Sequence, residues 1–297
     1  MTDHWEHGTT VANGLRFHFV EAGEGPTVLL LHGFPEFWSA WHRQLPSLAD
    51  AGFHAIAPDL RGYNRSEKPP GVSNYRLDRL VEDVVALAKT VGEPPIHLVG
   101  HDWGGLLAWE VAGRRPEVVD RLAVLNAPHP RAYERELRSL DQLLRSWYVA
   151  YFQVPFVPET VLGAGDAWLV GRLLESDPVR DDAFSWEDVR RYRAAASRPG
   201  ALRAAVHYYR ALGRATVRDW IGVGRGRPPG AMQASDIDVP TLLLWGLQDD
   251  ALSPRLTTGL DRWINDLAIE RFPDASHWLQ ADAPDRVSTE LVAFLEN

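Results

Sequence analysis

Cysteine is absent from this chain of 297 residues. Disulfide bonds, thiolate catalysis and zinc sites built on cysteine are therefore excluded. The chain also has no apolar run near the roughly 20 residues that span a bilayer, and no apolar segment of a signal peptide follows the polar residues 1–6. We therefore expect a soluble, cytoplasmic protein that does not bind a membrane.

Clusters of basic residues are missing as well. The formal net charge is −9, and no run of like charges occurs. An acidic chain without a basic stripe is a poor candidate for binding nucleic acid, so we expect no nucleic-acid partner. The apolar fraction of 45% is ordinary for a globular protein with a sizeable core. The sequence leaves the oligomeric state open, a homo-oligomer included.

Short strand-like runs alternate with helical patterns along most of the chain. The expected strands are Val11 with 15–20 around an Asn-Gly turn, then 27–31, 54–59, 96–100, 122–126, 241–245 and 268–272. The expected helices cover 37–51, 76–91, 106–112, 254–264 and 284–296. This alternation predicts an α/β fold with a mostly parallel central sheet flanked by helices.

The segment from 130 to 232 interrupts this alternation. It contains several helical patterns and no convincing strand, and an Arg/Gly/Pro-rich linker at 225–230 closes it. We therefore predict a core made of 1–129 and 233–297, with 130–232 inserted as a helical cap.

One stretch of the predicted core carries a recognisable catalytic geometry. The apolar strand 96–100 ends at a glycine, and Gly-x-Asp-x-Gly at 100–104 leads directly into a helix. Strand, sharp turn and helix form a nucleophile elbow, which lifts one side chain clear of the backbone. That side chain is Asp102, a carboxylate where a serine hydrolase has a hydroxyl. An aspartate here is also typical of a helix N-cap, so the motif needs partners.

Partners for Asp102 follow two later strands. Asp249 and Asp250 come after the strand at 241–245, and His277 follows the strand at 268–272. The order nucleophile, acid, histidine is that of the α/β-hydrolase triad. Since ligands bind beyond the carboxyl ends of parallel strands, we expect these side chains to converge. Asp249 is preferred as the acid, with Asp250 as the alternative.

An aspartate nucleophile implies a particular reaction. A carboxylate has no proton to give up, so Asp102 attacks an sp3 carbon and forms an alkyl ester, which water activated by His277 then hydrolyses. The backbone N–H groups of Phe34 and Trp103 are the expected oxyanion donors, and Pro35 is a candidate for a cis peptide. Neither a metal ion nor a cofactor is expected.

The leaving group is either a halide or an epoxide oxygen. A halide needs only N–H donors, whereas an epoxide oxygen needs an acid, for which a pair of tyrosines is suitable. The cap segment offers Tyr148 and Tyr151 in one helix and Tyr208 and Tyr209 in another. From this pattern alone, the choice within each pair stays open.

At this point the chain resembles the α/β-hydrolase-fold epoxide hydrolases, from about residue 10 to the C-terminus. His-Gly-Phe-Pro-Glu-Phe-Trp at 32–38 is similar to the family's oxyanion loop, and Gly-His-Asp-Trp-Gly-Gly at 100–105 to its nucleophile motif. Asp-Leu-Arg-Gly-Tyr at 59–63 resembles a further family segment. The resemblance implies the acid at Asp249 and the base at His277.

The resemblance extends to the cap. Tyr148 followed by Phe-Gln-Val-Pro at 152–155 resembles the family's first tyrosine motif, and Tyr209-Arg210 resembles the second. This implies Tyr148 and Tyr209 as the acids. The implied substrates are water and a small apolar epoxide, with Trp38 and Phe152 as candidate pocket residues.

Two other functions stay open. Haloalkane dehalogenases share the fold and a similar His-Asp-Trp-Gly elbow, and there Trp103 would bind the halide. A non-catalytic ligand receptor on the same fold is the second alternative, although it would be expected to have lost part of the triad.

Overall fold

The computed structural model describes residues 5–222, 230–233 and 235–297, and these contain one sheet of eight strands. The strands are β1 (Glu6–Ala12), β2 (Leu15–Ala22), β3 (Thr27–Leu31), β4 (His54–Pro58), β5 (Ile96–His101), β6 (Val119–Leu125), β7 (Thr241–Gly246) and β8 (Leu267–Phe272). Their order in the sheet is β1-β2-β4-β3-β5-β6-β7-β8. Only the β1–β2 and β2–β4 pairs are antiparallel. The mostly parallel sheet predicted from the sequence is confirmed.

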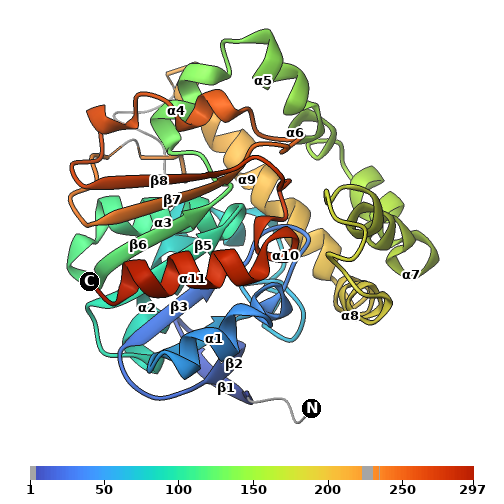
Figure 1. The fold of residues 1–297 in the computed structure, drawn as a ribbon. Coiled ribbons are helices and arrows are strands. Elements are labelled where there is room, and N and C mark those ends of the chain that lie inside the picture. The colour runs from blue at the N-terminus through green and yellow to red at the C-terminus, as the bar shows by residue number, and fades with distance from the viewer. Residues whose placement is uncertain (1–4, 223–229, 234) are drawn as a thin grey trace.

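Helices cover both faces of this sheet (Figure 1). They are α1 (Gln44–Asp50) and α11 (Pro284–Leu295) on one face, and α2 (Leu77–Val91) and α3 (Trp103–Arg114) on the other. Alternate residues of β3 therefore enter different cores: Val28 and Leu30 pack with α1 and α11, while Leu29 and Leu31 pack with α2 and α3. Burial on both faces explains why this strand is apolar throughout.

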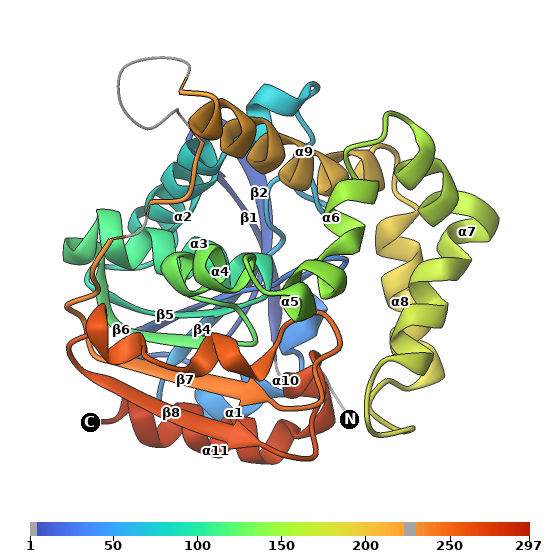
Figure 2. The same cartoon turned by 90° about the horizontal axis from the view of Figure 1, so that it is seen from above.

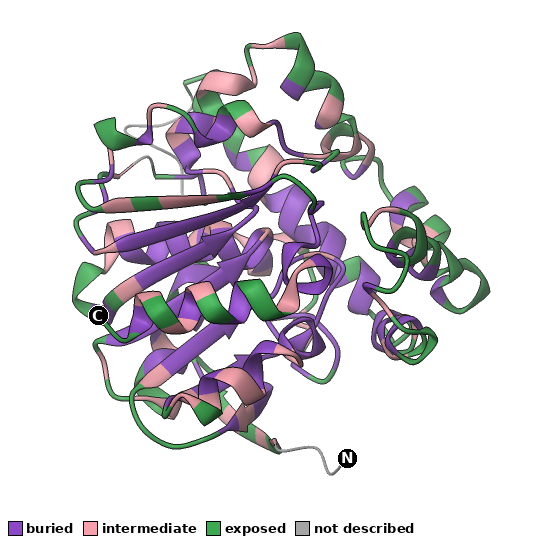
Figure 3. Ribbon diagram, viewed as in Figure 1, coloured by how far each residue is buried: buried purple, intermediate pink, exposed green. Residues whose placement is uncertain are grey.

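In the described part of the connection from β6 to β7, there are six helices. They are α4 (Pro130–Glu136), α5 (Leu140–Arg145), α6 (Trp147–Tyr151), α7 (Val157–Ser176), α8 (Trp186–Ala196) and α9 (Ala201–Trp220). Figures 1 and 2 show α6, α7 and α8 beside the carboxyl ends of the strands. In Figure 3 the central strands of the sheet are buried, whereas the edge strand β8 is partly exposed and α5 and α7 are largely exposed. The core and cap boundaries at 129/130 and 232/233 stay predictions, and 225–229 of the expected linker lie outside the described residues.

Two predicted helices differ from the structure. Residues 254–264 form two short 3₁₀ turns, Pro254–Thr257 and Leu260–Arg262, and not one helix. Gly259 between them has a φ of 65°, which an α-helix cannot accommodate. Residues 37–51 divide into a 3₁₀ turn at Trp38–Trp41 and the helix α1, which begins only at Gln44.

One further helix lies next to the predicted site residue His277. The short helix α10 (Leu279–Asp282) follows directly on His277 and Trp278. Within the described residues, no helix is both long enough and apolar enough to cross a membrane.

Candidate active site

Asp102 lies at a strained corner between β5 and α3. Its φ of 50° and ψ of −117° are outside the regions that residues other than glycine usually occupy. The flanking glycines make the corner possible: a Cβ on Gly104 would collide with the backbone of Leu31, and one on Gly100 with the backbone of Gly104. The corner therefore has the geometry of the predicted nucleophile elbow.

His277 stands between two carboxylates. Its Nδ1 lies 2.7 Å from Oδ2 of Asp249, and its Nε2 lies 3.7 Å from Oδ2 of Asp102. Oδ1 of Asp249 accepts hydrogen bonds from the N–H groups of Ala251 and Leu252, each at 2.8 Å. The structure thus brings Asp102, Asp249 and His277 together, whereas Asp250 is exposed.

Asn126 holds the acid from the side of the neighbouring strand. Directly after β6, its Nδ2 donates to Oδ2 of Asp249 at 2.7 Å and its Oδ1 accepts from the N–H of Gly246 at 2.8 Å. Asn126 is the last residue of the strand expected at 122–126, and it was assigned no role in the sequence analysis.

Two backbone N–H groups lie at the Asp102 carboxylate. The N–H of Phe34 donates to Oδ1 of Asp102 at 2.7 Å, and the N–H of Trp103 also interacts with this carboxylate. The Phe34–Pro35 peptide is cis. The same two N–H groups are placed to stabilise negative charge on this oxygen in a tetrahedral intermediate.

Neighbouring carboxylates raise the pKa of His277. Burial alone would lower the pKa of His277, but Asp249, Asp102 and Asp177 raise it to about 10. Burial raises the pKa of Asp102 from its usual range, and His277 opposes that shift. The pKa of Asp249 is lowered despite its burial, because His277 and Asn126 stabilise the charged form. With Asp102 unmodified, the imidazole is therefore an imidazolium.

Two tyrosines from the inserted helices lie near the nucleophile. The rings of Tyr148 in α6 and Tyr209 in α9 have centroids 6.0 Å apart, and Tyr209 lies 5.0 Å from the Trp103 ring and is hydrogen bonded to its side chain. Burial raises the pKa of both tyrosines well above its usual value, and the charge of Asp102 adds to the shift. Both hydroxyls consequently keep their protons near neutral pH.

The neighbouring tyrosines have other surroundings. The hydroxyl of Tyr208 donates to the backbone oxygen of Arg61 at 2.8 Å. The ring of Tyr151 lies against Trp147 and Phe152, with centroids 6.1 and 5.8 Å away. The charge of Asp102 contributes to the raised pKa of Tyr148 and of Tyr209, whereas the hydroxyl of Tyr208 is taken up by the Arg61 carbonyl.

Phe34 and Phe152 complete an aromatic cluster around Tyr209. The centroid of Phe152 lies 5.3 Å from that of Phe34 and 4.7 Å from that of Tyr209. The ring of Trp38 packs edge-on against Trp5 at the start of the chain, at 5.8 Å. Trp38 stays a predicted pocket residue.

A buried hydrogen-bonded pair next to Asp102, formed by His101 and Glu36, was given no role in the sequence analysis. His101 Nδ1 lies 2.7 Å from Oε2 of Glu36, both side chains are fully buried, and His101 Nε2 lies 2.9 Å from the backbone oxygen of His277. Glu36 also accepts the N–H of Gly33 at 2.8 Å. Both residues lie inside the motifs at 32–38 and 100–105, so the signal was their place in those motifs.

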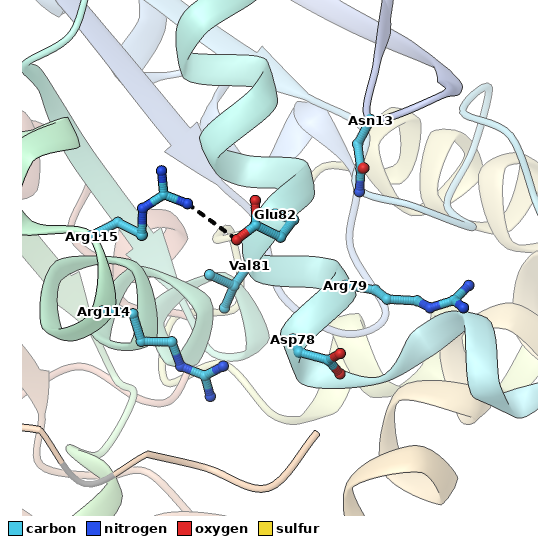
Figure 4. Close-up of a pocket in the computed structure, with 7 residues that line it drawn as sticks. All are labelled: Asn13, Asp78, Arg79, Val81, Glu82, Arg114 and Arg115. Carbon is cyan, nitrogen blue, oxygen red and sulfur yellow. Dashed lines mark hydrogen bonds and ion pairs between the residues drawn. The ribbon is translucent and has the colours of Figure 1, made fainter. Parts of the chain in front are cut away.

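A pocket outside the site of Asp102 and His277 lies between α2 and α3 (Figure 4). It is lined by Asn13, Asp78, Arg79, Val81, Glu82, Arg114 and Arg115. Its charges are largely satisfied within the protein, as by the ion pair of Arg115 with Glu82 at 3.2 Å. In the described part of the chain, no group of three or more histidine and acidic side chains is arranged to hold a metal ion.

Comparison with known proteins shows the family of this chain. Residues 26–284 match the family model described as alpha/beta hydrolase fold. The chain is 37% identical to the AB hydrolase superfamily protein YfhM of Bacillus subtilis, over 96% of each chain. The chain therefore belongs to the α/β-hydrolase fold family.

The relatives also indicate which members of that family it resembles. It is 35% identical to human epoxide hydrolase 4, over 96% of this chain and 76% of that one. A mutant of an epoxide hydrolase from Bacillus megaterium superposes with a TM-score of 0.88 at 30% identity, covering 98% of this chain and 100% of that one. Epoxide hydrolase A from Mycobacterium thermoresistibile gives 0.82 at 27% identity, covering 99% and 98%. The chain is a hydrolase of the epoxide-hydrolase group, which confirms the resemblance inferred from its sequence.

Proposed function

We propose that this protein adds water to an epoxide, giving a vicinal diol through an alkyl ester on Asp102. The observation that carries the proposal is the contacting pair Tyr148 and Tyr209, whose pKa values the charge of the partly buried Asp102 helps to raise. That carboxylate accepts the N–H of Phe34 and lies 3.7 Å from His277. The relatives named epoxide hydrolases support the same reaction. The division into a core (1–129 and 233–297) and a cap (130–232) belongs to this proposal.

In the first step, a carboxylate oxygen of Asp102 attacks one epoxide carbon. The carbon–oxygen bond of the ring breaks, and the epoxide oxygen takes a proton from Tyr148 or Tyr209, which leaves a tyrosinate. The raised pKa of each tyrosine keeps this proton in place until the oxygen becomes strongly basic.

In the second step, water attacks the ester carbonyl. Alkylation has removed the charge of Asp102, so the pKa of His277 falls. The imidazolium gives up its proton and the tyrosinate takes one back, which leaves a neutral imidazole that can accept a proton from this water. The N–H groups of Phe34 and Trp103 hold the oxyanion, and Asp249 stabilises the imidazolium. Collapse of the intermediate releases the diol and restores the Asp102 carboxylate, which now carries one oxygen from water.

The test uses Asp102→Ala and His277→Gln. The first should abolish diol formation, and the second should accumulate the ester on Asp102, detected by mass spectrometry after proteolysis. A single turnover of the wild type in 18O-water should label the Asp102 carboxylate. Absence of the label would exclude the covalent route.

Haloalkane dehalogenation is the second candidate, because the Trp103 indole borders the nucleophile. Its N–H would have to turn from Tyr209 towards a halide, and the two tyrosine hydroxyls would have no role. A haloalkane added to the same assay separates the two functions, since halide release without diol formation from any epoxide would favour the dehalogenase. A ligand receptor would show binding without turnover of either substrate.

The lining of the site indicates the class of epoxide. Phe34, Phe152 and the two tyrosine rings present mainly aromatic surface, which suits a small apolar or aryl-substituted epoxide. A hydrolysis screen with styrene-type, terminal aliphatic and internal epoxides would rank the substrates.

A further inference from the structure

Helix α5 is attached to the core by a glutamine and not by its leucines. Leu140, Leu143 and Leu144 are 77, 54 and 71% exposed, whereas Gln142 is completely buried. A surface helix normally buries its apolar side chains. The docking of α5 must therefore depend on the polar contacts of Gln142.

Gln142 uses both ends of its amide to bind the turn that contains the acid. Its Nε2 donates to the backbone oxygen of Ala251 at 2.9 Å, and its Oε1 accepts from the N–H of Ser253 at 2.9 Å. The turn 249–253 has its own internal support, since Asp249 accepts two of its N–H groups. Arg145 adds a bond from α5 to the backbone oxygen of Asp249 at 2.7 Å.

The same amide also reaches the helix that carries Tyr148. Nε2 of Gln142 lies 3.0 Å from Oγ of Ser146, the residue that precedes α6, and Tyr133 contacts this oxygen at 3.1 Å. Tyr148 follows two residues later. Gln142 thus connects a firm turn of the core to the start of the helix that places a tyrosine near Asp102.

We propose that Gln142 is a positioning residue for the ring-opening step: it fixes Tyr148 relative to Asp102 by tying α5 and α6 to the turn 249–253. This role rests on the function proposed above. Small displacements of a catalytic group can cost as much as about a hundredfold in rate, so a loss at this distance from the chemistry is measurable.

The first experiment compares Gln142→Met with the wild type in single turnovers of styrene oxide. Methionine has a similar length but makes none of these hydrogen bonds. Formation of the ester on Asp102 should slow about tenfold or more, whereas hydrolysis of the ester should change little, because Asn126 and the turn's own N–H groups still hold Asp249. Leu144→Ala, on the exposed face of α5, is the matched control and should react at the wild-type rate.

A double-mutant cycle identifies the path of the effect. In a Tyr148→Phe background, Gln142→Met should cause almost no further loss of ester formation, because the group that it positions is gone. An equal loss in both backgrounds would show that Gln142 does not act through Tyr148.

Gln142→Glu supplies a readout that a merely structural role would not change. Its carboxylate would repel the Ala251 carbonyl, whereas its protonated form can donate to it. Relative to the wild type at each pH, ester formation should therefore recover as the pH is lowered from about 8 to about 5, while the ratio for Gln142→Met stays flat. Arg145, Asp141 and Asp249 are neighbouring charges: Arg145 lowers the midpoint and the two aspartates raise it.

The outcomes separate this role from the proposed function. If the wild type forms no ester with any epoxide, the function itself is wrong. If the wild type forms the ester and Gln142→Met forms it equally fast, only the role of Gln142 is wrong. Should Gln142→Met fail to fold, Gln142→Glu decides by comparison between pH values, and no recovery at low pH overturns the proposal.

Discussion

Replacing Asp102 with asparagine should make His277 a much weaker base. The pKa of His277 is about 10, and burial works against this value. The elevation is therefore electrostatic, and Asp102 is one of the three carboxylates that produce it. Asparagine keeps the shape of the side chain and removes only the charge.

The size of the effect follows from the distance. His277 Nε2 lies 3.7 Å from Oδ2 of Asp102. At an effective dielectric constant of about 20, such a pair interacts by about 4 kcal/mol, or about 3 pKa units. The N–H groups of Phe34 and Trp103 also stabilise the carboxylate and reduce its field at the imidazole, so we expect a fall of about 1 to 3 units.

NMR titration of isotope-labelled imidazole measures this pKa directly. Asp177→Asn is the matched control, because Asp177 raises the same pKa by less than Asp102 does and should give a smaller fall. Intact mass confirms that the asparagine has not been hydrolysed back to aspartate. An unchanged pKa in Asp102→Asn would refute the idea that alkylation converts His277 from an acid into a base.

The same shift affects stability. The pKa of folded His277 is raised above its ordinary value of 6.5, so its contribution to the free energy of unfolding is complete below that pH and is lost as the pH rises towards about 10. In Asp102→Asn this loss should occur at lower pH, which urea denaturation across the alkaline range would detect.

Two further predictions concern the proposed tyrosine acids and the stability of the fold. Tyr148→Phe and Tyr209→Phe should each slow ester formation by up to about a hundredfold, whereas Tyr208→Phe should leave it near the wild-type rate; equal effects of all three in rapid-quench assays would contradict the assignment. Arg61 binds Asp83 through two hydrogen bonds of 2.6 Å, with both side chains buried. Arg61→Met should lower the free energy of unfolding by about 3 kcal/mol, and a second change, Asp83→Leu, should restore much of it; a urea midpoint unchanged by the single substitution would show that the ion pair is not needed.

Much of the site could be predicted because parallel strands end at one edge of a sheet. Asp102, Asp249 and His277 follow β5, β7 and β8, so strand positions alone brought them to the same place. Phe34 follows β3 for the same reason. These positions needed only local patterns, since a β-branched run followed by a glycine-rich turn is visible in the sequence itself.

One prediction of secondary structure, the helix at 254–264, was wrong. The stretch 254–264 had a helical pattern, but a left-handed Gly259 divides it, and packing determines that conformation. There the backbone conformation of one residue overrode the local helical pattern.

The sequence by itself determined the α/β architecture and the convergence of Asp102, Asp249 and His277, because each depends on hydrophobic period and on residues at strand ends. The residues alone left the choice within each tyrosine pair open until the family resemblance favoured Tyr148 and Tyr209. The tertiary structure showed that Tyr151 and Tyr208 have other surroundings. It alone also paired Gln142 with Ala251, across 109 positions of sequence. Such partners are chosen by how helices dock on the sheet, and no local pattern records that choice.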